Sequence, residues 1–394
     1  MAANDTLSLS RRDLMAGAAS LTLGALAAPA HAESPGVTAL WEKFCDALRP
    51  LAAHLGRPIG ASDPLTDLEG VRCLSRLVAL GLDQVLEYAD PKHPAFFELQ
   101  TATRKYLGDN PDQTYRTAVI DGASEYRVRT STAGAVAFEV GVYAGSFRSD
   151  AKSGSGGRRL VASLDERRVA PGADGILEFT LGPGSRPGNH LQTAPDANSL
   201  LVRTYFHDRA VRSAHALPTI ERLGPAEPLA PLSAEALTRG LLGAVAFVDG
   251  SLAFWNRFEG IRTAPNTLVV MPDDGAVQTP RAVRYLNGIV APKDDEALLV
   301  ELSPKDEPSY WNVVLQNLWG ETLDWRYLPV VRNNRELVHD PDGKVRIAIS
   351  HRPTNAVPSQ NWMSMAGHRS LLLSLRWRGE SALPLATPRL VPLD

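Results

Sequence analysis

Three short stretches of the sequence hold the residue types best suited to chemistry, and the first contains Asn110, Asp112 and Tyr115. Burial shifts the pKa of a carboxyl group, so Asp112 could act as a base or as a metal ligand, with Tyr115 as an acid. Asn110 would contact the substrate. The alternative is structural, because asparagine and aspartate are also common turn residues.

The second stretch is rich in aromatic and amide side chains, which can line a pocket for a planar, sugar-like or polycyclic ligand. Its candidates for substrate binding are Tyr310, Trp311, Asn317 and Trp319. On a strand, Trp311 would share one face with Val313. A place in the hydrophobic core is therefore the alternative for these aromatic residues.

The third stretch contains two histidines and two arginines together with Asn361 and Trp362. His351 could be a base and His368 an acid, because histidine titrates near neutral pH. Arg369 could bind an anionic group of a substrate that Asn361 and Trp362 also contact. A structural role is again the alternative for an isolated pair of histidines.

Several familiar motifs are missing from the sequence: the Gly-x-Gly-x-x-Gly and Walker loops, the His-Glu-x-x-His pair, Cys-x-x-Cys and Gly-x-Ser-x-Gly. Their absence argues against nucleotide-dependent enzymes, thiolate metal sites and α/β-hydrolases. We expect no cofactor, and a divalent metal held by scattered oxygen and nitrogen ligands is the alternative. Cys45 and Cys73 leave two interpretations open, a disulfide between helices or two free thiols.

Hydrophobic periodicity predicts an α+β protein that is mainly β, built from antiparallel, jelly-roll-like sandwiches. The N-terminal helical segment should include a third helix from Pro94, and a further helix is inserted between two β-rich parts. We find no internal repeat in the sequence. The expected parts are a signal at 1–32, the helical segment at 33–107, a β-sandwich part at 108–232, the helical insertion at 233–264 and a C-terminal β part at 265–394.

The N-terminal residues predict export from the cytoplasm. Ser10-Arg11-Arg12 precedes a short apolar stretch, and Ala30-His31-Ala32 is typical of a signal-peptidase site. We therefore expect the twin-arginine translocase as a partner and a periplasmic or secreted protein, with an ordinary secretory signal as the alternative. The formal net charge is −3 and no basic stripe is present. We expect no nucleic-acid partner and no membrane span in the mature chain.

Some of these residues also carry a resemblance to a known family. The segments Asn110-Pro111-Asp112, Asn361-Trp362, Gly367-His368-Arg369 and Arg376-Trp377 resemble bacterial proteins with the domain of unknown function 1214, which often follows a 1254 domain. The similarity spans about residues 105–380. It implies a jelly-roll-like β architecture with helical additions, and it implies no activity. The chain departs from the family pattern at Gln113, and its segment between His351 and Asn361 is longer than in the relatives.

Two functional hypotheses follow. The first is an exported enzyme that acts on a small oxygenated substrate by acid–base chemistry, as a lyase, dehydratase or hydrolase. Arg203 and Arg369 would then bind an anionic group of the substrate. The site would be lined by Trp311, Trp319 and Trp362. The second is a non-catalytic periplasmic protein that binds a carbohydrate or a hydrophobic ligand, as jelly rolls often do. Carboxylates or histidines with shifted pKa values in a pocket would favour the enzyme.

Overall fold

The computed structural model describes residues 35–56, 58, 63–147, 157–256, 264–271 and 283–393. The chain divides into two compact units, Met1–Lys43 and Phe44–Asp394. The described residues of the first unit belong to helix α1 (Pro35–Leu48), which continues into the second unit. All other described elements belong to the second unit. The predicted signal at 1–32 lies outside the described residues.

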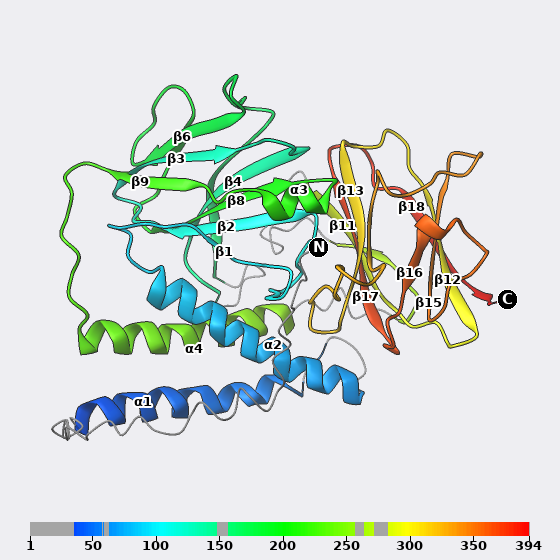
Figure 1. Cartoon of the computed structure of the whole chain (residues 1–394), viewed down its shortest axis with the longest axis horizontal. Helices are drawn as coiled ribbons and strands as arrows, with labels where there is room; N and C mark the ends of the chain where they lie inside the picture. Colours follow the sequence, from blue (N-terminus) through cyan, green and yellow to red (C-terminus); the bar gives the residue numbers. More distant parts are fainter. Residues whose placement is uncertain are drawn as a thin grey trace, which may run out of the picture. The chain divides into compact units, whose positions relative to one another are not determined.

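A first β-sandwich follows the N-terminal helices of the second unit (Figure 1). Its larger sheet has five described strands in the order β1-β2-β8-β4-β5, and its smaller sheet has four in the order β7-β6-β3-β9. The pairs are antiparallel except β6 with β7. The strands are β1 (Phe97–Glu98), β2 (Gln113–Val119), β3 (Glu125–Ser131), β4 (Ala137–Ala144), β5 (Arg159–Asp165), β6 (Ile176–Gly182), β7 (His190–Gln192), β8 (Ala197–Tyr205) and β9 (Thr219–Leu223).

A second β-sandwich is formed by the C-terminal part of the chain (Figure 1). Its larger described sheet has the order β10-β11-β17-β13-β14, and its smaller described sheet has the order β16-β15-β12-β18. Here the parallel pair is β15 with β16. The strands are β10 (Val269–Val270), β11 (Val283–Val290), β12 (Glu296–Ser303), β13 (Tyr310–Gln316), β14 (Val331–Asn333), β15 (Val345–Ser350), β16 (Trp362–Ser364), β17 (Leu371–Arg378) and β18 (Leu385–Pro392).

The two sandwiches have the same topology over the described strands. Adding nine to each strand number converts every pairing of the first sandwich into a pairing of the second, including the one parallel pair in each. Each sandwich also has its own hydrophobic core between its sheets. The predicted fold class, α+β and mainly β, is confirmed. The structure adds a repeat that the sequence analysis did not find, because strand pairing requires a pattern of alternation and not identical residues.

Helices α2 and α4 pack against each other beside the first sandwich (Figure 1). Helix α2 begins after Asp63, whose side chain accepts a hydrogen bond from the Thr66 amide at 2.8 Å. Gly81 lies where a Cβ atom would be 3.0 Å from the Ala244 carbonyl oxygen, so glycine permits the close approach of the two helices. Cys45 and Cys73 are free thiols. The helical segments are η1 (Arg49–His54), α2 (Pro64–Leu82), η2 (Asp83–Glu87), α3 (Arg209–Ala214), α4 (Ala234–Asn256) and η4 (Ser359–Asn361).

The helix expected from Pro94 is a wrong prediction. Phe97 and Glu98 instead form the edge strand β1, which pairs with Thr117 and Arg116 of β2. The stretch from there to β2 consists of turns and irregular backbone. Its apolar residues recur at helical spacing, but they contact the larger sheet and the cavity beside it. Tertiary contacts therefore override the local periodicity in this segment.

The inserted helix was predicted correctly and begins as expected. Ser233 caps α4, because its hydroxyl accepts a hydrogen bond from the Ala236 amide at 3.1 Å. By length and composition alone, α4 could cross a membrane. Many of its side chains are nevertheless buried inside the protein, among them Val248, Leu252 and Trp255. Packing inside the protein therefore accounts for the apolar residues of this helix.

Candidate functional site

A cavity of about 140 Å³ lies between the outer faces of the two larger sheets. An apolar cavity of similar volume can hold a benzene molecule, so this one has room for a ligand of about one ring. The end of α4 and the segment before β2 complete its wall. Its lining includes Leu107, Tyr115, Arg158, Leu201, Arg203, Tyr205, Trp255, Tyr285, Asn287, Gln316, Leu372, Ser374 and Arg376.

Strand alternation explains why these side chains point into the cavity. In β8, Leu200 and Val202 enter the core of the first sandwich, so Leu201 and Arg203 lie on the outer face. In β17, Leu371, Leu373 and Leu375 enter the second core, so Leu372, Ser374 and Arg376 lie on the outer face. The two sheets therefore present equivalent central strands to the same space.

Each sheet contributes a tyrosine next to an arginine. Tyr115 of β2 pairs with Arg203 of β8, and Tyr285 of β11 pairs with Arg376 of β17. These two pairs occupy equivalent positions, because β2 and β8 correspond to β11 and β17. On their other side, Arg203 pairs with Glu139 of β4, and Arg376 pairs with Asn312 of β13. The sandwiches therefore differ in the charge that faces each arginine.

Arg203 is compensated within its own sheet. Its guanidinium group is 3.2 Å from a Glu139 carboxylate oxygen and donates a hydrogen bond to the Tyr143 hydroxyl at 2.8 Å. Burial raises the pKa of Glu139 to about 7, although Arg203 opposes this shift. Burial also raises the pKa of Tyr115 far above its usual value. Because their pKa values are raised, neither the Tyr115 phenol nor the Arg203 guanidinium group gives up its proton readily, so neither can serve as a base.

Within the described residues, Arg376 donates its hydrogen bonds to backbone oxygens, and its guanidinium carbon lies 5.8 Å from the centroid of the Tyr285 ring. Its Nη2 atom donates to the Gly108 carbonyl oxygen at 2.7 Å and to that of Asp109 at 3.2 Å. Its Nη1 atom is buried, since the side chain is only 4% exposed, and it has no hydrogen-bond partner among the described residues. The Asn287 Oδ1 and Gln100 Oε1 atoms lining the same cavity also have no partner. A buried polar atom normally has a partner, so these atoms indicate a ligand or ordered water.

Three predicted site residues meet in a buried network that joins the two sandwiches, and they do not line this cavity. Tyr310 donates to the Asp112 Oδ2 atom at 3.1 Å, and Asn110 donates to the Tyr310 hydroxyl at 2.9 Å. Asn312 donates to Asn110 and Asp112 at 2.8 and 3.0 Å. Arg209 donates to the Asp112 Oδ1 atom at 2.6 Å. Burial raises the pKa of Asp112 despite this arginine. The contacts favour the structural alternative for these residues.

Trp311 and Trp319 lie in hydrophobic cores. Trp311 is in the second sandwich, with its ring centroid 5.7 Å from that of Trp377, because odd-numbered residues of β13 face inward. Trp319 packs against α2 and α4 and donates to the Thr66 carbonyl oxygen at 2.7 Å. We therefore assign both residues to packing and not to ligand contact.

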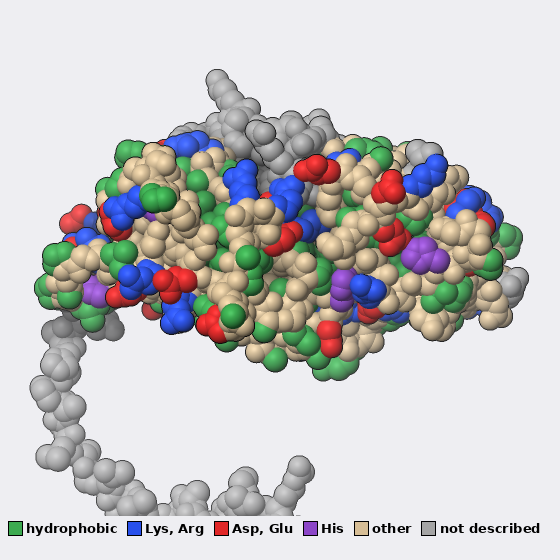
Figure 2. Space-filling view, turned by 90° about the horizontal axis from the view of Figure 1, so that it is seen from above, with side chains coloured by type: hydrophobic (Ala, Val, Ile, Leu, Met, Phe, Trp, Pro, Cys, Tyr) green, Lys and Arg blue, Asp and Glu red, His purple; other side chains and the backbone are tan. Residues whose placement is uncertain are grey.

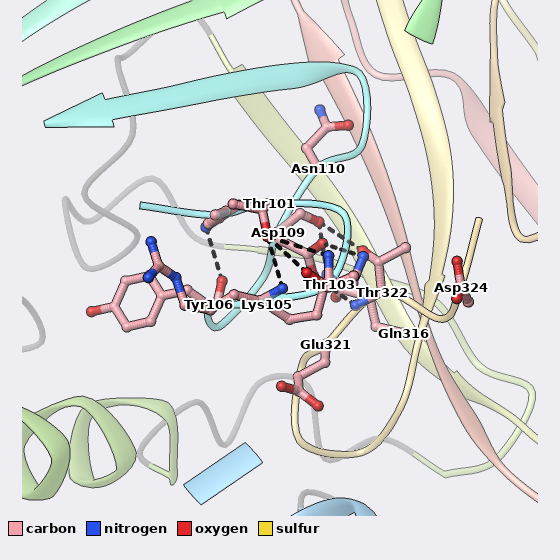
Figure 3. Close-up of polar contacts among 12 residues, drawn as sticks. Thr101, Thr103, Lys105, Tyr106, Asp109, Asn110, Gln316, Glu321, Thr322 and Asp324 are labelled. Carbon is pink, nitrogen blue, oxygen red and sulfur yellow. Dashed lines mark hydrogen bonds and ion pairs between the residues drawn. The ribbon is translucent and has the colours of Figure 1, made fainter. Parts of the chain in front are cut away.

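A second cavity, of about 200 Å³, contains two predicted residues, Asn317 and His368. The His368 Nε2 atom is 3.0 Å from a Glu69 carboxylate oxygen. Burial opposes protonation of His368, but the hydrogen bond and charge of Glu69 outweigh it and raise its pKa. Asn317 holds the tight turn before Glu321 by accepting hydrogen bonds from the amides of Trp319 and Glu321. Figure 3 shows Glu321 and Thr322 beside Lys105 and Asp109.

The remaining predicted residues lie in separate environments. His351 is 3.5 Å from Asp294, which is on the surface, and Arg369 is exposed. Asn361 is buried and binds the backbone of Val338 through both its amide nitrogen and its oxygen, each at 2.8 Å. Trp362 donates to the Ser350 hydroxyl at 3.0 Å. The structure therefore does not bring Asp112, His351 and His368 to one cavity.

Comparison with other proteins gives a close relative of solved structure. An uncharacterised protein from Burkholderia cenocepacia is 30% identical, with a TM-score of 0.81, and the match covers 91% of this chain and 98% of the relative. The model of a protein of unknown function, DUF1214, matches residues 299–379. The chain belongs to the family of the Burkholderia protein and carries the DUF1214 domain.

A protein from Vibrio parahaemolyticus is similar at 10% identity and a TM-score of 0.49, over 89% of this chain and all of that one. No curated protein matches the sequence. In this DUF1214 protein the matched segment runs from β12 through β17, so it includes Asn312, His368 and Arg376. Tyr115 and Arg203 of the cavity lie outside that segment.

The sequence analysis identified Tyr115 and Arg203 of the cavity but not Arg376, Tyr285, Asn287 or Arg158. The sequence of β17 does contain a pattern that singles out Arg376, because the polar residues Ser374 and Arg376 alternate with apolar residues along the strand. It could not show whether that strand face meets water or another sheet. The sequence analysis also missed Glu69, Lys105 and Glu321 of the second cavity.

A bound divalent metal was the alternative prediction to a protein without a cofactor, and the described residues of this DUF1214 protein show no set of ligands for one. Within those residues, no group of three or more His, Cys, Asp or Glu side chains is placed to hold a metal ion. The ion pairs of the second cavity join carboxylates to arginine, lysine or histidine.

Proposed function

We propose that this protein binds a small organic anion of about one ring in the cavity between its two sandwiches. The observation that carries the proposal is the Arg376 Nη1 atom, which is buried, charged and without a hydrogen-bond partner. A carboxylate or other oxyanion at this atom would supply the acceptor that the protein lacks there. Hydrogen bonds to charged groups are stronger than those between neutral groups, which would give such a ligand specificity.

The charges around the cavity support an anion in particular. Arg158, Arg203 and Arg376 line it, and the described lining residues include no Asp, Glu or His. Glu139 offsets Arg203 from behind, whereas no carboxylate among the described residues forms an ion pair with Arg376. Bringing an anion to an uncompensated buried arginine offsets part of the cost of removing both from water.

The other lining residues support an apolar body with a polar substituent. Leu107, Trp255 and Leu372 provide apolar contact. Asn287 offers an oxygen without a hydrogen-bond partner, which would accept a hydrogen bond from a ligand hydroxyl or amide. A hydroxylated aromatic acid combines these features at the size of the cavity.

Binding is better supported than acid–base catalysis. Acid–base work at neutral pH usually requires a carboxylate or a histidine within reach of the substrate. Glu139 is held behind Arg203, and Asp112 and His351 lie elsewhere. A lyase or hydrolase that uses this cavity would depend on its tyrosines, and burial keeps the phenol of Tyr115 protonated. We therefore rank the ligand-binding hypothesis above the enzyme hypothesis.

Export and partner choice are part of the same proposal. A periplasmic or secreted binding protein would be delivered by the twin-arginine translocase, as the N-terminal arginines Arg11 and Arg12 suggest. We expect no nucleic-acid partner, because the formal net charge is −3 and because acidic and basic side chains are interspersed on the one face that Figure 2 shows.

Calorimetric titration with benzoate, 4-hydroxybenzoate and the neutral analogue benzamide tests the proposal. We expect the acids to bind and Arg376→Met to weaken them by about tenfold to a hundredfold, since a charged hydrogen bond contributes about 1.5–3 kcal/mol. Arg335→Met is the matched control, because it removes the same charge from an exposed position. Equal affinity for benzamide, or unchanged binding by Arg376→Met, would contradict the proposal.

A further inference from the structure

The second cavity is separate from the cavity between the sandwiches, because the two share no lining residue. It lies where α2 meets the loop between β1 and β2, the loop after β13 and the turn before β17. Glu69, Arg72 and Arg76 reach it from one face of α2, since residues three and seven positions apart align on a helix. Lys105 and Glu321 reach it from the two loops.

The loops hold their charged side chains in place through many hydrogen bonds. Asp109 accepts a hydrogen bond from the Thr322 amide at 2.6 Å and lies 3.5 Å from the Lys105 ammonium group (Figure 3). Arg76 is 2.8 Å from the Glu321 Oε2 atom, and Asn317 donates to the same oxygen at 3.4 Å. The positions of Lys105 and Glu321 are thus fixed in the absence of a ligand.

Several buried polar atoms at this cavity have no hydrogen-bond partner within the part of the chain that the structure describes. They are the Glu321 Oε1, Glu69 Oε2 and Lys105 Nζ atoms. Glu321 and Lys105 are only 2% and 3% exposed, so bulk water reaches them poorly. Two are acceptors when ionised and the third is a donor. A ligand that satisfies all three needs both N–H donors and an oxygen acceptor.

The buried charges of this cavity are paired before any ligand enters, and the exposed Arg72 adds one positive charge at its edge. Arg76 is paired with Glu321, Lys105 with Asp109, and His368 with Glu69. Because a net charge placed among buried and already paired groups is costly, the cavity disfavours simple anions and simple cations. A molecule with both charges and no net charge avoids this cost.

We propose that this cavity binds a small zwitterion that carries an ammonium and a carboxylate group, such as an amino acid. The ammonium group lies at Glu321 and Glu69, and the carboxylate lies at Lys105. The volume of about 200 Å³ exceeds that of the first cavity and leaves space for a short side chain. The site is independent of the proposed anion site between the sandwiches.

Calorimetric titration of the purified full chain with glycine, L-serine and L-glutamine tests the inference. Acetate and methylammonium serve as probes that carry one charge each. At least one of the amino acids should bind, and both single-charge probes should bind at least tenfold more weakly. Glu321→Gln and Lys105→Met should each weaken that amino acid at least tenfold, whereas Arg376→Met should not change it.

Glu235→Gln and Lys293→Met are matched controls, because they make the same substitutions at exposed positions. If Lys105→Met unfolds, Glu69→Gln replaces it, and thermal melting shows which variants are folded. The inference is overturned if none of the three amino acids binds, if acetate or methylammonium binds equally well, or if folded variants of Glu321 and of Lys105 or Glu69 retain full affinity. Loss of benzoate binding alone would bear only on the first cavity.

Discussion

The two sandwiches have the same strand order, but their equivalent arginines have different surroundings. Arg203 faces Glu139, and Arg376 faces Asn312, whose amide is used by the network around Asp112. One sheet therefore contains an ion pair, whereas in the other the described hydrogen bonds of the arginine go to backbone oxygens. The difference teaches that a single position on a neighbouring strand decides whether the equivalent arginine is paired with a carboxylate or is left available for the ligand that we propose.

The largest expected effect is on stability, where the two arginines should differ. Arg203→Met leaves the Glu139 carboxylate buried without its partner, and breaking a buried ion pair in this way costs about 3–5 kcal/mol. Arg376→Met removes the side-chain donor of the Gly108 carbonyl oxygen, at about 1–3 kcal/mol, whereas the Asp109 oxygen keeps hydrogen bonds from Gln316 and Thr322. Urea unfolding of both variants at pH 8 measures the difference. Equal losses of unfolding free energy would remove the distinction between the sandwiches.

The next effect is the pH dependence of stability that Glu139 gives to the first sandwich. The pKa of Glu139 rises from 4.5 to about 7 on folding, so between those values the folded protein keeps a proton that the unfolded chain has released. This contribution to stability is complete below pH 4.5 and is lost as the pH rises through 7. Its size is on the order of 3 kcal/mol.

Glu139→Gln should remove that dependence, because glutamine has no proton to release in this range. Urea unfolding from pH 4.5 to 8 should show a shallower decrease of stability for the variant than for the wild type. Glu235→Gln is the exposed control. Parallel curves for Glu139→Gln and the wild type would mean that Arg203 keeps the carboxylate ionised throughout.

A smaller effect concerns the ligand site and follows from exchanging equivalent residues. Ser374 of β17 occupies the position that Leu201 occupies in β8, by the same register that aligns Arg376 with Arg203. Ser374→Leu therefore makes the second sheet more like the first and adds side-chain volume to the cavity. We expect benzoate to bind about tenfold more weakly, or about 1.4 kcal/mol, in calorimetric titration. Leu201→Ile keeps the volume and should leave affinity nearly unchanged.

Much of the fold could be predicted from local pattern. The alternation in β13 correctly placed Trp311 and Val313 on one face, and the Ser233 cap marked the start of α4. The segment after Pro94 was predicted wrongly because its apolar residues have helical spacing but contact a sheet. The repeat was missed because the two sandwiches share strand pairing and not recognisable residues.

The candidate site was harder to predict, since it depends on contacts between distant segments. Tyr115 and Arg203 were identified by residue type, but Arg376 became a candidate only when the two larger sheets were seen to enclose a cavity. Asp112 was predicted as a catalytic base because it is an acidic residue near a strand. Its partners Tyr310 and Asn312 are about two hundred residues away in sequence. Sequence spacing contains no information on such partners.

The shared strand order also has a consequence for the order of folding during synthesis. Strands β1–β9 occupy residues 97–223, and strands β10–β18 occupy residues 269–392. Each sandwich is therefore formed from one continuous length of chain, and the first can close while the ribosome is still making the second. Until the second half has been made, the Asp112 carboxylate lacks its contacts with Tyr310 and Asn312 and remains in contact with water. The docking of the two halves is the step that buries it and closes the cavity around Arg376.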